Sequence, residues 1–193
     1  MKDKIYDIYW DLIGWRTRYI YRKFKNLYRW FPIIWNDQDY DKHYIFEILK
    51  FKLKNQAKHI GDNDRHTRAA LDAKRMRICV ELIDKVADEY YSGEYMDYHE
   101  TKWEFTDIPD KPGYSTLNMD IISERFNEYF KKYPLVYKKV LTDEKLQIFN
   151  IDLADDESEI DKRIAMNIGH YNHKRARKLL FKIIEENIEG WWD

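Results

Sequence analysis

The sequence predicts an all-α fold, in which an antiparallel helical hairpin packs with N- and C-terminal helices and one long irregular loop lies near residues 92–119. Three observations predict this class. Apolar residues recur three and four positions apart over most of the chain, which is the spacing of one helix face. Glycine and proline gather between residues 93 and 113, where that spacing is lost. A length of 193 residues indicates one domain, or one domain with a small appendage.

We expect four parts within this single domain, residues 1–193. Residues 1–35 form basic and aromatic helices, 40–91 the helical hairpin, 92–119 the loop, and 120–193 the C-terminal helices. In the first part, Ile20, Phe24, Leu27 and Phe31 follow steps of four, three and four. We expect Pro32 to end this helix and Gly14 to separate it from a helical stretch at 5–13.

The hairpin begins after a polar turn at residues 35–41, where Asp39 or Asp41 is a suitable N-cap. Its first helix covers about 40–60, a turn signal follows at 61–64, and its second helix covers about 65–91. Because the connection is short, the two helices should run antiparallel.

Residues 92–119 lack helical spacing. Lys102 to Asp107 could form a short strand, but no partner strand is evident, so an ordered loop and a small β-excursion both stay open. Helix should resume near 120–133, with a further short helix at 135–149. The acidic run 155–159 suits the start of the last helices, Gly169 to His173 suggests a break or kink, and Gly190 a stop.

Composition favours an intracellular protein. Cys79 is the one cysteine, so an internal disulfide is impossible, and no apolar run approaches the ~20 residues of a membrane span. The start of the chain does not resemble a secretory signal, so we expect the cytoplasm. Net charge is +5 over residues 1–30, zero over 31–92 and −6 over 93–193. Such asymmetry permits a basic contact surface or head-to-tail contact between copies.

Catalytic motifs are absent from the sequence, so we expect no enzyme and no cofactor. It contains no Gly-x-Ser-x-Gly elbow, no phosphate-cradling glycine loop and no dinucleotide fingerprint. Cys79 stands on a predicted apolar helix face and is expected in the core. His170 and His173 are three residues apart, but no Glu-x-x-His or cysteine pair accompanies them, so we expect no metal site.

One candidate ligand site lies at the start of the second hairpin helix. Several cations at a helix N-terminus could hold phosphate groups, and an aromatic ring could stack on a base. The residues of this site are Arg65, His66, Arg68, Asp72, Arg75, Trp35 and Tyr40. The alternative is a solvated helix face with internal salt bridges.

A second candidate surface is the basic and aromatic stretch 15–35. Aromatic rings beside cations suit nucleic acid, a membrane surface or a partner helix. A plain amphipathic helix with snorkelling cations is the alternative. The candidate contacts are Arg16, Arg18, Arg22, Arg29 and Trp30.

Three segments carry a resemblance. Residues 29–41, the turn Pro112-Gly113-Tyr114-Ser115 and the C-terminal run 175–193 resemble segments of uncharacterised small helical accessory proteins encoded by tailed bacteriophages. The resemblance implies a viral accessory protein in the cytoplasm of the host bacterium. It implies no activity and no functional residue.

From this we expect a non-enzymatic binding protein. The first hypothesis is anti-defence: sequestration of a phosphorylated or nucleotide immune signal of the host. The alternatives are a protein–protein inhibitor or assembly factor acting on a host or phage protein, and a nucleic-acid-binding protein. Tyrosine and tryptophan number 23 together, and such side chains are enriched at interfaces, so we also expect a homo-oligomer.

Overall fold

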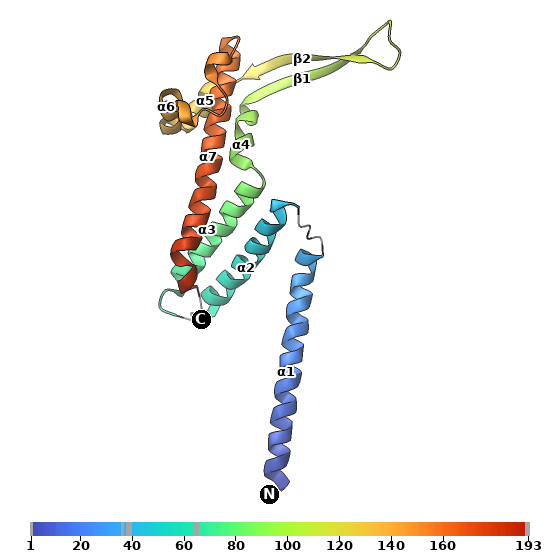
Figure 1. Cartoon of the computed structure of the whole chain (residues 1–193), viewed down its shortest axis with the longest axis vertical. Coiled ribbons are helices and arrows are strands. Elements are labelled where there is room, and N and C mark those ends of the chain that lie inside the picture. The colour runs from blue at the N-terminus through green and yellow to red at the C-terminus, as the bar shows by residue number, and fades with distance from the viewer. Residues whose placement is uncertain (1, 36, 38–39, 64–65, 192–193) are drawn as a thin grey trace. The chain divides into compact units, whose positions relative to one another are not determined.

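The computed structural model describes residues 2–35, 37, 40–63 and 66–191, and for residues 2–13 and 63 it describes the backbone alone. The described chain is mainly α-helical with one two-stranded antiparallel sheet (Figure 1), which confirms the predicted class and its short β-excursion. The chain divides into two compact units, residues 1–55 and 56–193. The single domain that the sequence suggests stays a prediction beside this division.

The elements have the following bounds. The α-helices are α1 (Lys2–Ile34), α2 (Lys42–Asn63), α3 (Ala69–Ala87), α4 (Tyr90–Gly93), α5 (Phe126–Lys132), α6 (Pro134–Thr142) and α7 (Glu157–Asn187). The strands are β1 (His99–Asp107) and β2 (Ser115–Glu124). Short 3-10 helices cover Glu94–Tyr98, Glu144–Leu146, Ile151–Leu153 and Ile188–Gly190.

Helix α1 is continuous, so the predicted separation at Gly14 and the predicted end at Pro32 are wrong. A glycine inside a helix costs about 1 kcal/mol relative to alanine. Ending and restarting a helix costs more, since each end leaves four backbone groups without intrahelical partners. Pro32 removes one backbone donor from the last turn, and the helical hydrogen bonds continue past it, since the Trp35 N–H donates to the Phe31 carbonyl at 2.9 Å.

Two contacts join α1 to the middle of α2. The Trp30 ring meets the Phe51 ring edge-on, with 4.7 Å between centroids. The Arg29 guanidinium donates to Asn55 Oδ1 at 2.7 Å. At the start of α2, Asp41 Oδ1 accepts from the His43 backbone N–H at 2.8 Å, which confirms Asp41 as an N-cap. Asp39, the other predicted cap, lies outside the described residues.

The end of α2 and the start of α3 differ from prediction by several residues. Helix α2 passes through Gly61 and ends at Asn63, while α3 begins at Ala69 and ends at Ala87. Gly61 touches α3: a Cβ there would lie 3.1 Å from the Ala73 Cβ. The Gln56 side-chain amide donates to the Trp191 carbonyl, so the last turns of α2 also hold the chain end.

Helix α7 is the spine of the second unit, since α3, α4, α5 and α6 all pack on it. Its start is capped by Asp156, whose side chain accepts from the Glu159 backbone N–H at 2.8 Å, which confirms the acidic start. The helix continues through 169–173, so the predicted break is wrong. Gly169 has another role there: a Cβ would lie 2.8 Å from the Tyr91 carbonyl oxygen, so α4 approaches at backbone distance.

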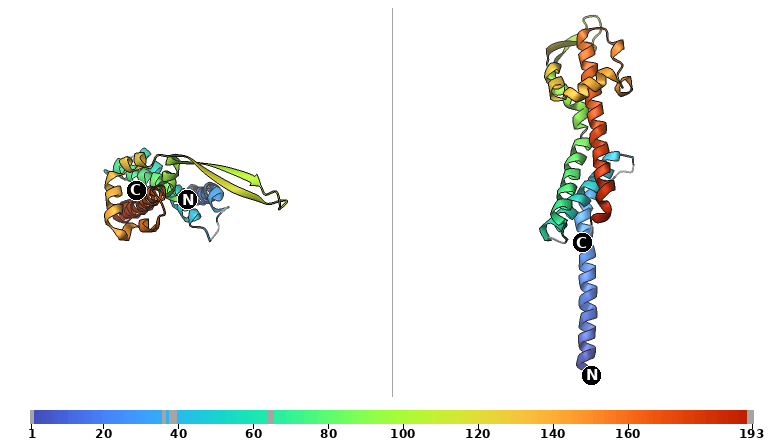
Figure 2. Two further views of the ribbon diagram at one scale, coloured as in Figure 1. Left: turned by 90° about the horizontal axis from the view of Figure 1, so that it is seen from above. Right: turned by 90° about the vertical axis from the view of Figure 1, so that its left-hand side faces the viewer.

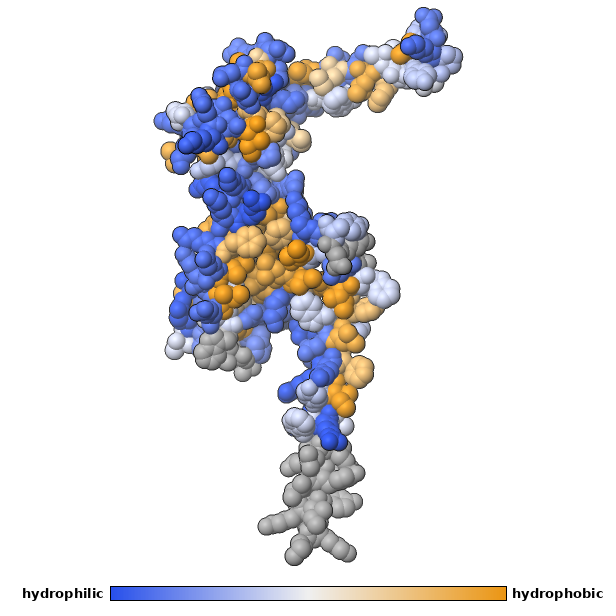
Figure 3. Space-filling view, in the orientation of Figure 1, coloured by the Kyte–Doolittle hydropathy of each residue, from blue (hydrophilic) through white to orange (hydrophobic). Residues whose placement is uncertain are grey.

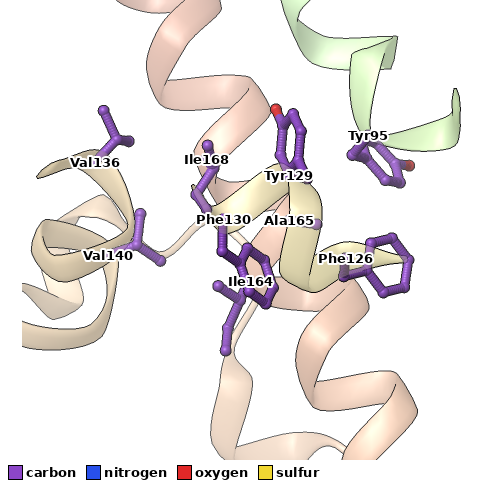
Figure 4. Packing of buried hydrophobic residues seen from close by; sticks show 9 residues of the cluster. All are labelled: Tyr95, Phe126, Tyr129, Phe130, Val136, Val140, Ile164, Ala165 and Ile168. Carbon is purple, nitrogen blue, oxygen red and sulfur yellow. The ribbon is translucent and has the colours of Figure 1, made fainter. Parts of the chain in front are cut away.

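One hydrophobic cluster lies between α7, α5, α6 and the turn at 94–98 (Figure 4). Its buried members are Tyr95, Phe126, Tyr129, Phe130, Val136, Val140, Ile164, Ala165 and Ile168. A second buried row on α3 includes Met76, Cys79 and Ile83. Burial raises the pKa of the Cys79 thiol to about 11, so the thiol is protonated at neutral pH. Cys79 is buried, as predicted from its place on the apolar helix face.

Within residues 92–124 the chain forms two strands, so the β-excursion is correct and the ordered loop is not. The strand predicted at Lys102 to Asp107 extends to His99, and its partner is β2. Helix does not resume near 120, because residues 115–124 belong to β2, and α5 begins only at Phe126. The helix predicted at 135–149 ends at Thr142.

The close approach at Gly169 yields a test of the α4–α7 contact. Gly169→Ala should lower the free energy of unfolding by about 1–3 kcal/mol, as overpacking does, although alanine is the better helix former. Urea unfolding followed by circular dichroism measures it. Gly14→Ala is the matched control, because nothing lies within 4 Å of a Cβ there. A stabilised Gly169→Ala protein would contradict the packing described.

Candidate functional site

Strands β1 and β2 and their connection, residues 99–124, form an arm with two chemically different faces. Cross-strand pairs on one face join Trp103 to Met119, Phe105 to Leu117 and Thr101 to Ile121. The other face pairs Lys102 with Asp120, Glu104 with Asn118 and Thr106 with Thr116. Because successive side chains of a strand alternate between faces, this register makes one face apolar and the other polar.

The apolar face of the arm is open to solvent. Trp103 exposes 58% of its surface, Phe105 71% and Met119 52%. In the second unit the arm leaves the helices near the start of α7 and extends away from them (Figures 1 and 2), and apolar patches lie along it between polar surface (Figure 3). A two-stranded sheet alone is marginally stable in water, and such sheets usually gain stability by packing this face.

The arm is acidic. Residues 99–124 carry six Asp or Glu and two Lys, for a net charge of −4. Lys102 and Glu104 neighbour each other at 3.7 Å on the polar face. An acidic arm repels phosphate backbones, so it suits a protein partner better than nucleic acid.

The tip of the arm is ordered by its own backbone. The Ile108 N–H donates to the Tyr114 carbonyl at 3.0 Å, and the Tyr114 N–H donates to the Lys111 carbonyl at 3.1 Å. Gly113 has φ +85°, in the left-handed region that glycine enters without strain. The Pro112-Gly113 turn is therefore a hydrogen-bonded connection between the two strands.

A cavity of about 710 Å³ lies where the arm meets α7. Its apolar lining continues the apolar face of the arm and consists of Met119, Ile121, Ile148, Phe149, Leu153 and Met166. The backbone of Phe149, one of these residues, is bound by the fully buried Asn167 side chain, which accepts from the Phe149 N–H at 2.9 Å and donates to the Phe149 carbonyl at 2.7 Å. The cavity and the arm thus form one apolar surface.

A bulge at the base of the arm brings a carboxylate to this surface. The register shifts between Glu100 and Thr101, so that His99 pairs with Glu124 while Thr101 pairs with Ile121. One residue of β2 is therefore extra, and the alternation of faces switches across it. As a result Glu124 lines the same cavity as Met119 and Ile121.

The polar groups in the cavity do not form a nucleophilic triad. Ser158 Oγ donates to Glu124 Oε1 at 2.6 Å, and His99 Nδ1 lies 3.4 Å from the same oxygen, outside hydrogen-bond geometry. The carboxylate thus stands between hydroxyl and imidazole, whereas a triad needs the imidazole in the middle as the base for serine. His99 instead stacks on Phe126 and contacts Thr101 Oγ1 at 2.7 Å through Nε2.

The predicted phosphate site at the start of α3 forms an ion network. Asp72 is buried, with Arg75 at 3.1 Å and Arg68 at 3.8 Å from its carboxylate. His66 Nδ1 accepts from the Arg68 N–H at 3.2 Å and closes the turn that precedes the helix. Two predicted phosphate ligands are thus directed to a carboxylate, and Arg65 lies outside the described residues. Phosphate binding there stays a prediction.

The other predicted contacts lie in the first unit. Trp35 and Tyr40, the proposed stacking residues, are 70% and 86% exposed. The cations Arg16, Arg18 and Arg22 are exposed on α1, whereas Trp30 and Arg29 contact α2 as described. Binding of nucleic acid or of a partner by these side chains stays a prediction.

Histidines and carboxylates do not gather into a metal site within the described residues, where no three His, Cys, Asp or Glu side chains could share an ion. His170 is half-buried against the Phe149 ring, at 5.3 Å between centroids. None of the described helices combines the length and apolar character needed to cross a bilayer.

A buried carboxylate organises the tyrosines beside the arm. Glu94 accepts from the Tyr133 hydroxyl at 2.7 Å and from the Lys132 ammonium. The Tyr129 ring packs on Tyr133, 5.3 Å away. Burial, together with the charge and hydrogen bond of Glu94, raises the pKa of the Tyr133 hydroxyl well above its usual value, and burial does the same for Tyr129.

Comparison with protein-family models, with curated proteins and with solved structures finds no match for this chain.

The arm is the site that sequence reasoning missed. Thr101, Trp103 and Phe105 alternate with polar residues, and Leu117, Met119 and Ile121 do so after a Pro-Gly turn. Considered together, these two runs of alternating residues would have predicted the β-hairpin of β1 and β2. Residues 121 and 122 obscured it, because consecutive isoleucines at the bulge mimic the start of a helix face.

The tyrosine cluster predicts a loss of stability in alkali. Unfolded tyrosine has a pKa of about 10, and the folded values for Tyr129 and Tyr133 are higher. The unfolded chain therefore releases protons first, so the free energy of unfolding should fall as pH rises above about 10. Urea titrations at several pH values measure the slope. Tyr133→Phe should flatten it, Tyr114→Phe on the exposed tip should not, and identical slopes in both variants would contradict this account.

Proposed function

We propose that this chain is a non-enzymatic protein-binding protein, an assembly factor or inhibitor, that binds its partner through the apolar face of the arm and the adjoining cavity. The observation that carries the proposal is an apolar sheet face with 58% of Trp103 and 71% of Phe105 exposed. Large exposed apolar surfaces of this kind mark interaction sites.

The energetics favour binding at this face. Burying one large apolar side chain contributes about 1.5–3 kcal/mol, and Trp103, Phe105, Leu117 and Met119 stand side by side in two cross-strand pairs. Interfaces concentrate their binding energy in such a cluster, with aromatic residues near its centre. The ordered tip reduces the entropy that binding would otherwise cost.

The chemistry of the partner follows from the same residues. It should offer an apolar patch to the arm, and basic side chains around that patch, because the arm carries a net charge of −4. An apolar projection of the partner fits the cavity of about 710 Å³, whose lining offers the Lys162 ammonium to a carboxylate of the partner, while the Arg163 guanidinium is already paired with Glu159. A second copy of the chain is one partner with such groups.

Sequestration of a phosphorylated host signal and nucleic-acid binding have less support. The first would use Arg68 and Arg75, whose guanidinium groups are directed to Asp72. The second would use α1, since the arm is acidic. The phage origin, and with it a host protein as the partner, rests on the resemblance of three short segments.

Paired substitutions on the two faces of the arm test the proposal. Trp103→Asp with Phe105→Asp should weaken partner binding by at least a hundredfold, which is about 2.7 kcal/mol or two modest hot-spot residues. Thr106→Asp with Asn118→Asp adds two charges to the polar face and should leave binding nearly unchanged. Quantitative affinity capture from bacterial lysate compares the variants, and sedimentation velocity detects a second copy as the partner.

Two results would contradict the proposal. One is equal retention of a stoichiometric partner by both double variants. The other is a wild-type chain that stays monomeric and captures no stoichiometric partner. Circular dichroism confirms that each variant keeps its helices.

A further inference from the structure

Helix α1 carries an apolar stripe that nothing in the proposed function uses. Ile20, Phe24, Leu27, Phe31 and Ile34 follow steps of four, three, four and three, so they lie along one line of the helix. All five are exposed, from 45% for Ile34 to 67% for Phe24. In the space-filling view, apolar surface runs along one side of the coloured part of α1 (Figure 3).

The opposite side of the helix is cationic. Arg18, Arg22, Lys25 and Arg29 follow steps of four, three and four. At 100° per residue this row lies half a turn from the apolar stripe. Residues 14–34 contain six Lys or Arg and no Asp or Glu, so the field of this segment has one sign.

Aromatic side chains with polar edges lie between these two faces. Tyr21 and Tyr28 border the stripe on one side, and both are exposed. Tyr19 lies toward the other side, stacked on Trp15 at 5.6 Å, with the Lys23 ammonium 4.4 Å above its ring. Amphipathic rings between an apolar and a charged zone match the boundary between acyl chains and headgroups.

From this arrangement we propose that α1 binds in the headgroup region of an anionic phospholipid membrane, with the Ile20–Ile34 stripe toward the acyl chains. Such a surface accepts the apolar stripe and attracts the cations at once. A nucleic acid would engage the cations and leave the stripe in water. Two α1 helices paired along the stripe would bring together two segments of six cations each without a compensating acid.

The membrane surface is independent of the arm. It uses residues 14–34, whereas the proposed protein partner uses residues of the second unit. Variants in the arm should therefore leave vesicle binding unchanged, and variants in α1 should leave capture of the protein partner unchanged. Failure of either proposal is then visible without the other.

Co-sedimentation of the full chain with vesicles tests the inference. The chain should bind vesicles of equal parts phosphatidylcholine and phosphatidylglycerol, bind pure phosphatidylcholine much more weakly, and lose affinity as salt rises. Phe24→Asp with Leu27→Asp should abolish binding. Arg18→Gln with Arg22→Gln should weaken it roughly thirtyfold, as expected for two surface cations.

Matched controls exist on other helices. Leu135→Asp with Leu141→Asp places the same substitutions at exposed positions of α6, and Lys52→Gln with Lys54→Gln removes two exposed cations of α2. Both controls should bind the mixed vesicles like the unmodified chain. Circular dichroism shows that the α1 variants keep their helix content, and the arginine variant serves if the aspartate variant does not.

Three outcomes would overturn the inference. The first is equal binding to both kinds of vesicle. The second is salt-sensitive binding to an oligonucleotide duplex that the arginine variant loses, without binding to vesicles. The third is a dimer that the Phe24→Asp, Leu27→Asp variant dissociates, again without binding to vesicles.

Discussion

Backbone contact between α4 and α7 at Gly169 constrains the path of the chain into the arm. A methyl group at this position would lie 2.8 Å from the Tyr91 carbonyl oxygen, so the two backbones touch there. Helix α4 runs directly into the turn at 94–98 and then into β1. The contact therefore fixes where the arm starts, and the cluster around Tyr95, Phe126 and Ile168 packs beneath that start. The place where the arm starts therefore depends on the absence of a side chain at Gly169.

Two amphipathic elements of the chain leave their apolar side uncovered, and their charges are opposite. Residues 14–34 of α1 carry six cations, while the arm has a net charge of −4. In most folded proteins the apolar faces of such elements are buried in the core, because burying apolar area is the main favourable term in folding. Their exposure leaves this apolar area available for binding. In the two proposals the charges then select the partners, an anionic surface for α1 and a protein with basic side chains around its apolar patch for the arm.

Sequence reasoning recovered the elements that have a strong local signal. The helical period of α1 and α7, the Asp41 cap, the acidic start at Asp156 and the buried Cys79 were all predictable from their neighbours in the chain. The continuity of the helices through Gly14 and Gly169 was not predictable. In a sequence, a glycine that ends a helix cannot be distinguished from one that lets a neighbouring backbone approach closely. The pairing of β1 with β2 was missed for a similar reason, since register is a property of two segments. The ion network around Asp72 was foreseen as the alternative to a phosphate site, and the burial of Asp72 and its contacts with Arg75 and Arg68 favour it.

The bulge between His99 and Ile121 gives the two ends of the arm different tolerance to change over evolution or in engineering. At the tip, adding or removing one residue pair from each strand would lengthen or shorten the arm and keep Trp103 and Met119 on the same face. At the base, deleting the extra residue Ile122 would remove the bulge and leave Glu124 on the face of Met119 and Ile121, because Glu124 would then follow Ile121 by two positions. The length of the arm is therefore adjustable in steps of two residues per strand at the tip, whereas the base tolerates the loss of one residue without moving Glu124 to the other face.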